Sequence, residues 1–413
     1  MSAGIALAGL LPSGCASLDK PGFVRSGAQP VTSLPGWSQE SATGLRKAIA
    51  AQCRVAALAP PWPRLCATLE QIPTSEAAAT TATVKARTSH GPLSAARLAH
   101  HASLASDDYL KQWIRQHFDA WQLINRLGAG DGLLTGYYEP LLTGSLTREN
   151  PDQVALYARP ADLIAADPMF TRGQIETGQS DQRLSGLQLL WLDDPIEAFF
   201  LHIQGSGKVR LRDGRIVRAG FAGHNGHPYV AIGAELISKG KIRRADMTAD
   251  AIKQWIRANP VAGRELMHSN PRFIFFKLDF SQPDGVGPAG SMQVPLTSLR
   301  SVATDKRYLP AGSLLYLDSH LPASRKRAGA GDTNRNVANH DRDEGKSLVG
   351  LTLTQDTGSA IRGAVRADLF TGSGQLAGQL AGQMKQPARI WLLWPKGKVP
   401  PATIPVARPV INP

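Results

Sequence analysis

The stretch that decides the fold runs Thr354-Gln-Asp-Thr-Gly-Ser-Ala-Ile-Arg-Gly363 and continues as Ala364-Val-Arg-Ala-Asp-Leu-Phe-Thr-Gly372. It places two carboxylates, Asp356 and Asp368, on short segments, with six glycines between Gly358 and Gly382. Glycine is typical of places where the backbone takes a positive φ angle or lets a ligand come close. Charged residues between strand-forming residues are rare unless they are paired or take part in chemistry. The stretch therefore predicts acid/base work on a glycosidic or ester bond.

Short apolar segments surround this stretch and are separated by glycines. Regular short strands of this kind are typical of a small closed barrel, so we expect mainly β structure here. The polar, Gly-rich residues 324–346 predict a long solvent-exposed loop. The predicted strands cover residues 294–303, 313–317, 348–353, 363–370 and 390–393.

Upstream of this region the periodicity is mixed. Apolar residues recur every three or four positions from Leu110 to Ile124, which predicts an amphipathic helix from Ser106 to just before Gly128. Residues 133–140 predict a strand that a proline ends. Residues 141–280 predict short strands with two helices, one over 229–239 and one after the cap at 247–250.

Composition sets the class of protein. The 413 residues are 42% hydrophobic, which is enough for a real core and predicts two domains. The net charge of +13 favours an acidic polymer such as a cell wall, or an anionic membrane surface. Aromatic residues are only 6% and do not interleave with basic runs, so no nucleic acid is expected. Nothing after residue 15 has the apolar length of a membrane-spanning helix.

The N-terminus carries a localisation signal. Leu10-Leu-Pro-Ser-Gly-Cys15 resembles a bacterial lipoprotein cleavage box, which predicts a signal segment over 1–15 and a lipid on Cys15; an ordinary tail with a chance cysteine is the alternative. Residues 16–100 are rich in Ala, Ser, Thr and Pro and predict a tether with a helical piece near 44–58. Cys53 and Cys66 predict a disulfide in an oxidising compartment, or else two reduced thiols.

Three further clusters combine glycine with hydroxyl, amide or imidazole groups, as the lining of a groove for a sugar-like ligand does. The alternative for each is a polar turn between strands. The histidines His202, His224 and His227 match no zinc spacing, so no metal is expected. Ser206 lacks the flanking pattern of a nucleophile elbow. The clusters are Thr135-Gly-Tyr-Tyr-Glu-Pro140, Phe200-Leu-His-Ile-Gln-Gly-Ser-Gly207 and Ala222-Gly-His-Asn-Gly-His-Pro-Tyr229.

These clusters, together with Asn270-Pro-Arg-Phe-Ile-Phe-Phe-Lys277, Val294-Pro-Leu-Thr297 and the aspartate stretch, resemble the family of membrane-bound lytic murein transglycosylase A from about Ser106 to Pro395. The resemblance implies a double-ψ β-barrel interrupted by a large β-rich second domain, with the substrate groove between them. The barrel, called the 3D domain, would comprise residues 101–140 and 286–398. The inserted domain would comprise 141–285, and 399–413 would form a tail.

The resemblance also implies roles for single residues. Asp368 would be the catalytic acid and then base, and we expect Asp356 to support it by keeping it protonated through like charge. Asp305, the third family aspartate, is expected to be structural because Lys306 and Arg307 can pair with it. The expected substrate-binding residues are Thr135, Gly136, Tyr137, Gln204, Gly205, Ser206, Gly207, His224, Asn225 and His227.

The activity implied is cleavage of the β-1,4 bond between MurNAc and GlcNAc in peptidoglycan, leaving a 1,6-anhydro-MurNAc end, without a cofactor. A peptidoglycan glycoside hydrolase on the same barrel and a non-catalytic peptidoglycan-binding lipoprotein are the alternatives. The implied partners are glycan strands, the lipid of an outer-membrane anchor on the periplasmic face, and cell-wall synthesis or hydrolase complexes.

Overall fold

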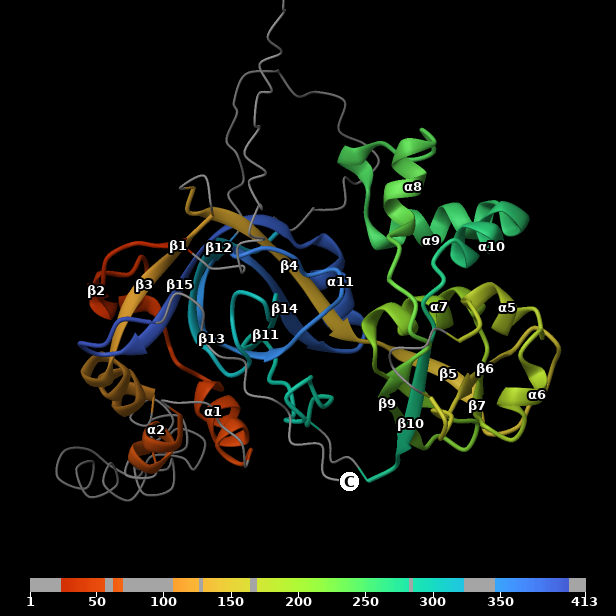
Figure 1. Cartoon of the computed structure of the whole chain (residues 1–413), viewed down its shortest axis with the longest axis horizontal. Helices are drawn as coiled ribbons and strands as arrows, with labels where there is room; N and C mark the ends of the chain where they lie inside the picture. Colours follow the sequence, from red (N-terminus) through yellow and green to blue (C-terminus); the bar gives the residue numbers. More distant parts are fainter. Residues whose placement is uncertain are drawn as a thin grey trace, which may run out of the picture.

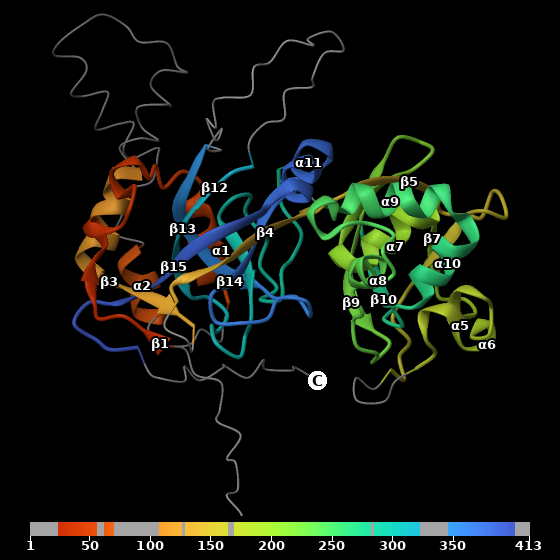
Figure 2. The same cartoon turned by 90° about the horizontal axis from the view of Figure 1, so that it is seen from above.

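The computed structural model describes residues 24–55, 62–69, 107–125, 129–163, 169–281, 285–322 and 346–400. Two sheets lie side by side, joined by the long strand β4 (Asp131–Glu139) (Figures 1 and 2). We call them the barrel unit and the inserted unit, because the chain leaves the barrel after β4 and returns to it some 160 residues later at β11 (Ser301–Thr304).

Six strands close the barrel. Their order is β15-β12-β13-β11-β14-β4, and the ring closes because β15 pairs with β12 along one part and with β4 along another. Closure leaves no free strand edge in the ring. The predicted closed barrel is therefore confirmed. The remaining barrel strands are β12 (Leu314–His320), β13 (Ser347–Asp356), β14 (Arg366–Ser373) and β15 (Lys385–Pro395).

One predicted barrel strand is much shorter than expected. Only the last three residues of the 294–303 segment are in a strand, as the start of β11. Residues 288–297 instead form a folded loop, in which the Gly290 N–H donates to the Val294 carbonyl and Gln293 takes a φ of +59°. Pro295 has no N–H with which to continue a ladder. The loop contacts the end of β13, where the Met292 N–H donates to the Gln355 carbonyl, and just after the loop the Leu299 N–H donates to the Phe370 carbonyl of β14.

The barrel strands are covered on both faces for part of their length. The inner face carries Leu134, Val302, Ala367 and Leu369, which pack together with residues of β12 and β15. The helix α11 (Gln375–Gln383) lies against β4 and β14, and Gly136 has no side chain because a Cβ there would lie 2.9 Å from the Ala381 backbone. Gly136 therefore serves close packing in this structure.

The N-terminal segment covers the outer face of the barrel over β12, β13 and β15, away from α11. Residues 24–55 and 62–69 of the segment expected to be a tether fold against β12, β13 and β15, and the helical piece expected near 44–58 is present at Leu45–Cys53. Trp37, Leu45 and Ile49 are buried there, and Glu40 forms a buried ion pair with Arg300. This segment contains β1 (Val24–Arg25), β2 (Gln29–Pro30), η1 (Val31–Ser33), η2 (Trp37–Gln39), α1 (Leu45–Cys53) and α2 (Trp62–Leu69).

A disulfide joins α1 to α2. Cys53 and Cys66 are bonded, with their Cα atoms 5.7 Å apart. Both cysteines pack against the same core cluster as Trp37 and Ile49. The pairing expected from cysteine arithmetic is thus present in the structure, whereas Cys15 lies outside the described residues.

The helix predicted from Ser106 to Gly128 is half wrong. Residues 107–117 are helical, but Phe118–Ile124 form β3, which pairs with β15 on one side and with β1 and β2 on the other. The spacing of Phe118, Trp121 and Ile124 fits a helix, but the burial pattern of the strand also places Ala120 and Leu123 inside. Pairing with a strand near the C-terminus decided the outcome, and local periodicity cannot show such a partner.

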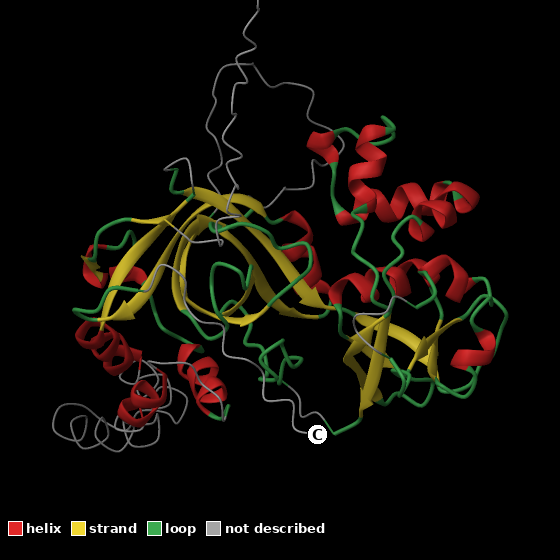
Figure 3. Cartoon of the chain, viewed as in Figure 1, coloured by secondary structure: helices red, strands yellow, loops and turns green. Residues whose placement is uncertain are grey.

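The inserted unit is an open six-stranded sheet with most of the helices around it (Figure 3). Its strand order is β10-β9-β8-β5-β7-β6. The strands are β5 (Leu141–Ser145), β6 (Val154–Tyr157), β7 (Gln188–Leu192), β8 (Gly207–Arg210), β9 (Ile216–His224) and β10 (Ile274–Asp279). The helices are α5 (Arg172–Glu176), α6 (Asp181–Leu184), α7 (Pro195–Gln204), α8 (Ile232–Ser238), η3 (Arg244–Asp246), α9 (Ala249–Ala258) and α10 (Pro260–His268).

Both predicted helices of this unit are present as α8 and α9. Thr248 caps α9 by accepting a hydrogen bond from the Ala251 N–H, as the sequence pattern indicates. Helix α7 was not predicted, although Asp194 caps it and Pro195 opens it. No helix within the described ranges is long and apolar enough to cross a membrane.

Candidate active site

Four neighbouring strands of the barrel place the carboxylates in one row. In the register of the sheet, Ala303 of β11 pairs with Asp356 of β13 on one side and with Asp368 of β14 on the other. Asp368 in turn pairs with Thr135 of β4. Because neighbours such as Ala367 and Leu369 face the barrel core, the alternating Asp368 points to the outer face. We call Asp356, Asp368, Thr135 and Tyr137 the carboxylate row.

Asp368 accepts a hydrogen bond from the Thr135 hydroxyl, which itself accepts one from Arg366 Nη2 at 2.7 Å. The residue keeps part of its surface accessible to solvent. Burial in the site is the main influence and raises the pKa of Asp368 above its ordinary value, and the charge of Asp356 raises it further. The Thr135 hydrogen bond and the Arg366 charge act in the opposite direction but do not cancel the rise. A carboxyl group in this state can hold a proton.

Asp356 lies in a more polar setting. Its Oδ1 accepts the N–H groups of Ser291 at 2.9 Å and Thr357 at 2.8 Å, and its Oδ2 accepts the Tyr137 hydroxyl at 2.9 Å. Burial raises the pKa of this carboxyl as well, and the three donors oppose the rise. Three hydrogen-bond donors stabilise the ionised form of Asp356. Asp368 accepts one side-chain hydrogen bond, from Thr135, and the charge of Arg366 acts on it without a hydrogen bond between them. The pKa of both carboxyls is raised, and Asp356 has more hydrogen-bond donors to oppose the rise than Asp368 has.

Tyr137 connects the two ends of the row. Its ring lies 5.4 Å from that of Phe370, the residue two positions beyond Asp368 on the same strand. Burial and the Asp356 charge hold the pKa of Tyr137 well above its ordinary value, so the phenol stays protonated and donates to Asp356. Tyr137, expected as a sugar-binding residue, is thus placed directly against a carboxylate.

Asp305, the third aspartate, has a structural setting. Arg307 binds its carboxylate through Nη2 at 2.5 Å and Nε at 2.9 Å, and the N–H groups of Arg307 and Gly363 complete the shell. Although burial acts to raise it, these hydrogen bonds hold the pKa of Asp305 below its ordinary value. The bond to Gly363 anchors the loop between Asp356 and Asp368. The geometry fits the predicted structural role.

The cluster at residues 204–207 lies next to β4. Gln204 ends α7, and its Oε1 accepts the N–H of Tyr138 at 3.3 Å. Gly205 takes the left-handed conformation with a φ of +83°, Ser206 is half-buried, and Gly207 is buried where a Cβ would lie 3.1 Å from Pro140. The fold therefore brings the predicted clusters around Thr135 and Gln204 together.

The cluster at 224–227 does not have the expected character. The side chain of Asn225 is fully buried; it donates to the carbonyls of Phe170 and Pro271 and accepts the Phe273 N–H, each at 2.8 Å. His227 Nε2 bonds the Met169 carbonyl at 2.6 Å. Asn225 therefore ties three backbone segments of the inserted unit together, and its amide has no free group to offer a sugar.

His224, like His227, is half-buried. Its Nδ1 accepts the Gly226 N–H at 3.0 Å, and burial and the nearby Arg272 lower its pKa. Among the described residues no group of three His, Cys, Asp or Glu side chains could hold a metal ion.

Two residues of the site were not predicted. Arg366 orients the Thr135 hydroxyl, and it could have been found because it lies two positions before Asp368 and so shares its face of the strand. Ser291 supplies a backbone N–H to Asp356 from the 288–297 loop. Its sequence carries no signal for this role, since any residue other than proline has an N–H.

Comparison with known proteins gives the class first: the two units are those of lytic transglycosylases. Residues 133–277 match the family described as "MltA specific insert domain", and residues 300–394 match the family described as "3D domain". A structure of the lytic transglycosylase LtgG of Burkholderia pseudomallei is 35% identical, covers 91% of this chain and 98% of its own, and has a TM-score of 0.52. MltA from Neisseria gonorrhoeae is 26% identical, with 94% and 98% covered and a TM-score of 0.66.

The sequence comparison is more specific. Membrane-bound lytic murein transglycosylase A of Vibrio cholerae is 32% identical over 300 residues, which cover 69% of this chain and 74% of that protein. This chain belongs to the membrane-bound lytic murein transglycosylase A family.

Proposed function

We propose that this protein is a lytic transglycosylase that cleaves the β-1,4 bond between MurNAc and GlcNAc in peptidoglycan and leaves a 1,6-anhydro-MurNAc end. The observation that carries the proposal is the carboxylate row, in which two neighbouring aspartates have different hydrogen-bond environments. Family membership supports the reaction type, and the row supplies the groups that the reaction needs.

In the proposed reaction Asp368 acts twice. Its proton passes to the glycosidic oxygen, the bond between that oxygen and muramyl C1 breaks, and positive charge develops on the ring. The carboxylate left on Asp368 then takes the proton of the muramyl 6-hydroxyl, whose oxygen closes on C1. No water is consumed. In its ionised form Asp356, which accepts three hydrogen bonds, stabilises the positive charge at C1 and favours the proton on Asp368 at the start of the cycle.

The glycan is proposed to lie between the two units, in contact with Thr135, Tyr137 and Gln204. The contact of Gln204 with β4 and the outward direction of the carboxylate row support this path. The barrel is proposed to be of the double-ψ type, in agreement with its six closed strands. The relatives are named membrane-bound, and we propose anchoring through a lipid on Cys15 at the periplasmic face of the outer membrane.

The test is product analysis. The protein is incubated with purified sacculi, and the soluble muropeptides are separated and weighed by mass spectrometry. We expect 1,6-anhydro ends, whereas reducing-end muramic acid indicates a hydrolase and the absence of any product indicates a binding protein. Asp368→Asn is expected to lower the rate by about 10²–10⁴-fold, the range for loss of a general acid–base group. Near-wild-type activity in this variant contradicts the assignment of Asp368.

A further inference from the structure

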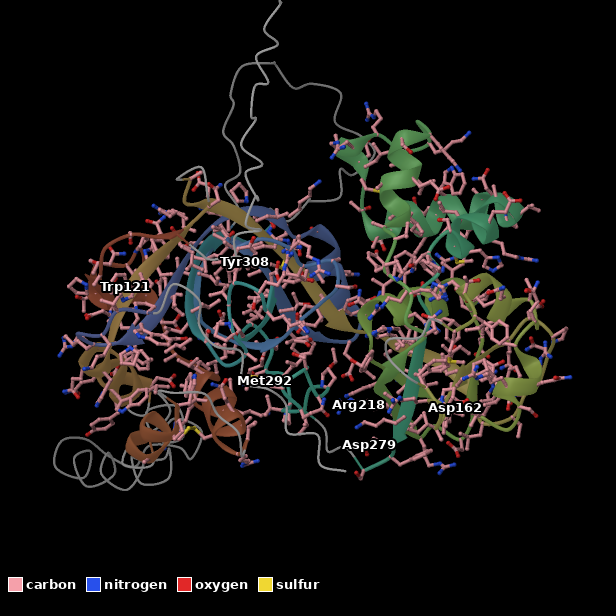
Figure 4. All side chains as sticks on the ribbon, viewed as in Figure 1. Trp121, Asp162, Arg218, Asp279, Met292 and Tyr308 are labelled. Atoms are coloured by element: carbon pink, nitrogen blue, oxygen red, sulfur yellow. A yellow bond between two sulfur atoms is a disulfide. The ribbon has the colours of Figure 1, made fainter. Side chains whose placement is uncertain are left out.

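A buried ion pair joins the two units. Glu139 is the last residue of β4 and is fully buried, while Arg218 comes from β9 of the inserted unit and is 5% exposed. Arg218 Nε and Nη2 contact the two carboxylate oxygens at 2.5 Å and 3.1 Å. Figure 4 shows Arg218 on the side of the inserted unit that faces the barrel. A two-point contact of this kind fixes the orientation of both groups as well as their distance.

The pair also holds both chain connections between the units. Glu139 directly precedes Pro140, where the chain leaves the barrel, and Arg218 Nη2 donates to the Val286 carbonyl at 2.6 Å, where the chain returns. On the barrel side, the Ser373 hydroxyl donates to Glu139 Oε2 at 2.6 Å. The Gly374 N–H donates to the Glu139 carbonyl at 2.8 Å. Four separate chain segments therefore meet at this pair.

The pair lies on the same face of β4 as the carboxylate row. Thr135, Tyr137 and Glu139 are two residues apart, so their side chains share one face of the strand. In order, they contact Asp368, Asp356 and Arg218. The strand that carries the catalytic contacts thus ends in the contact that holds the inserted sheet.

We propose that Arg218 is a positioning residue, which fixes the angle of the inserted sheet to the carboxylate row so that one glycan strand engages both units. The inference rests on the proposed function for its substrate. Stability alone does not explain the pair, because two apolar residues of similar volume are often as stable as a buried ion pair. The two-point contact fixes the angle between the inserted sheet and the barrel, and a glycan strand that contacts both units needs that angle to be constant.

The first test is kinetic. Arg218→Gln is compared with Arg212→Gln, a change of an arginine in the same unit whose ion pairs with Asp193 and Glu149 are exposed. For long glycan strands we expect KM to rise about tenfold in Arg218→Gln, with kcat within about threefold of wild type. This is the result expected when a variant loses binding that is equally strong for the substrate and for the transition state. We expect a smaller rise for a tetrasaccharide muropeptide. Kinetics equal to those of Arg212→Gln, or a loss in kcat alone, overturn the proposal.

A second set of variants separates positioning from stability. Arg218→Met combined with Glu139→Leu removes both charges, so that no unpaired buried charge remains. We expect this double variant to recover most of the melting temperature while KM for long strands stays raised. Arg218→Lys, which keeps the charge but not the fork, is expected to recover part of the affinity. Recovery of wild-type KM in the double variant overturns the proposal.

A third measurement does not depend on catalysis. Hydrogen exchange of the folded Arg218→Gln protein is expected to be faster at the Gly374 amide and in peptides that cover 139–143 and 285–290, with β12 and β13 unchanged. If wild type releases no anhydro product, the proposed function fails, and this exchange pattern still tests the pair. Unchanged exchange at all three places overturns the positioning role.

Discussion

The barrel and the inserted unit each contain a polar cluster flanked by glycine, and the two clusters differ in what their side chains still offer. In the carboxylate row, Asp368 and Tyr137 remain partly accessible and their bonds run to other side chains of the row. In the cluster at 224–227, the Asn225 amide is buried and bonded entirely to the main chain. The same sequence signal therefore marks the proposed catalytic site in one sheet and a buried structural hydrogen-bond cluster in the other.

The difference lies in the partners. A side chain bonded to backbone groups of distant segments stabilises the fold, because those groups would otherwise be buried without partners. A carboxylate desolvated beside another carboxylate has a raised pKa, and this is a typical mark of catalysis. Glycine next to a polar residue indicates only that the backbone is unusual there. The following changes are designed to break this contrast.

The largest effect is expected from Asn225→Ala. The change leaves two carbonyls and one N–H without their partners inside the inserted unit, so the free energy of unfolding is expected to fall by about 3 kcal/mol. Chemical denaturation measures the loss, with Asn150→Ala in an exposed turn as the control. The rate per folded molecule is expected to stay near that of wild type. A rate reduced tenfold without loss of stability restores Asn225 as a substrate-binding residue.

Tyr137→Phe is expected to lower kcat/KM by about tenfold, the factor for one lost hydrogen bond of about 1.4 kcal/mol to a charged group. Because the Asp356 carboxylate loses a donor, its pKa is expected to rise, and the low-pH limb of the rate profile should move to higher pH. Tyr229→Phe, a change of a half-buried tyrosine in the inserted unit, serves as the control. An unshifted profile shows that Asp356 need not be ionised.

Asp368→Asn is expected to stabilise the protein at pH 7, because it removes a carboxyl group whose pKa is raised by folding. The pKa of Asp368 is higher in the folded than in the unfolded protein, so ionisation at neutral pH favours unfolding. Below the unfolded value of about 4 the group is protonated in both states, and the gain should vanish.

Asp305→Asn provides the control of opposite sign. The pKa of Asp305 is lowered in the folded protein, so its charge stabilises the fold above the unfolded pKa, and that contribution is lost as pH falls through the folded value. We therefore expect Asp305→Asn to lower the melting temperature at pH 7 and to have little effect in acid. Melting curves between pH 3 and pH 7 for both variants measure whether each change raises or lowers the melting temperature. Equal signs contradict the opposite roles given to these aspartates.

The smallest effect is expected from Gly205→Ala. A Cβ would meet open space there, but the φ of +83° is unfavourable for alanine, so stability should fall by about 1 kcal/mol or less. Gly382→Ala, in the last turn of α11 with equal space, is expected to stabilise slightly. Thermal unfolding measures both. A large loss of activity in Gly205→Ala with normal stability indicates that a ligand approaches this backbone closely.

Much of the barrel site was predictable from the sequence, because its residues stand on short strands with a two-residue period. Asp368, Thr135 and Tyr137 follow from that pattern and from the family resemblance. The strand Phe118–Ile124 was missed because its partner β15 lies far along the chain. The N-terminal segment was taken for a tether because its composition is polar and Ala-rich, whereas Glu40 and Trp37 hold it to the barrel through contacts with Arg300 and Tyr316. Asn225 was misjudged because a sequence does not show which amide is buried.

The closure of the barrel by β15 also limits the order in which the two units can fold. The partners Thr135 and Asp368 are separated by 233 residues, and β4 gains its second neighbour only when Lys385–Arg389 has been synthesised. The inserted unit is continuous from Leu141 to Asp279, so it can fold before the barrel is complete. Contacts so distant in sequence form slowly as well as late. Until β14 pairs with β4, the chain therefore lacks the contact between Thr135 and Asp368 on which the proposed reaction depends.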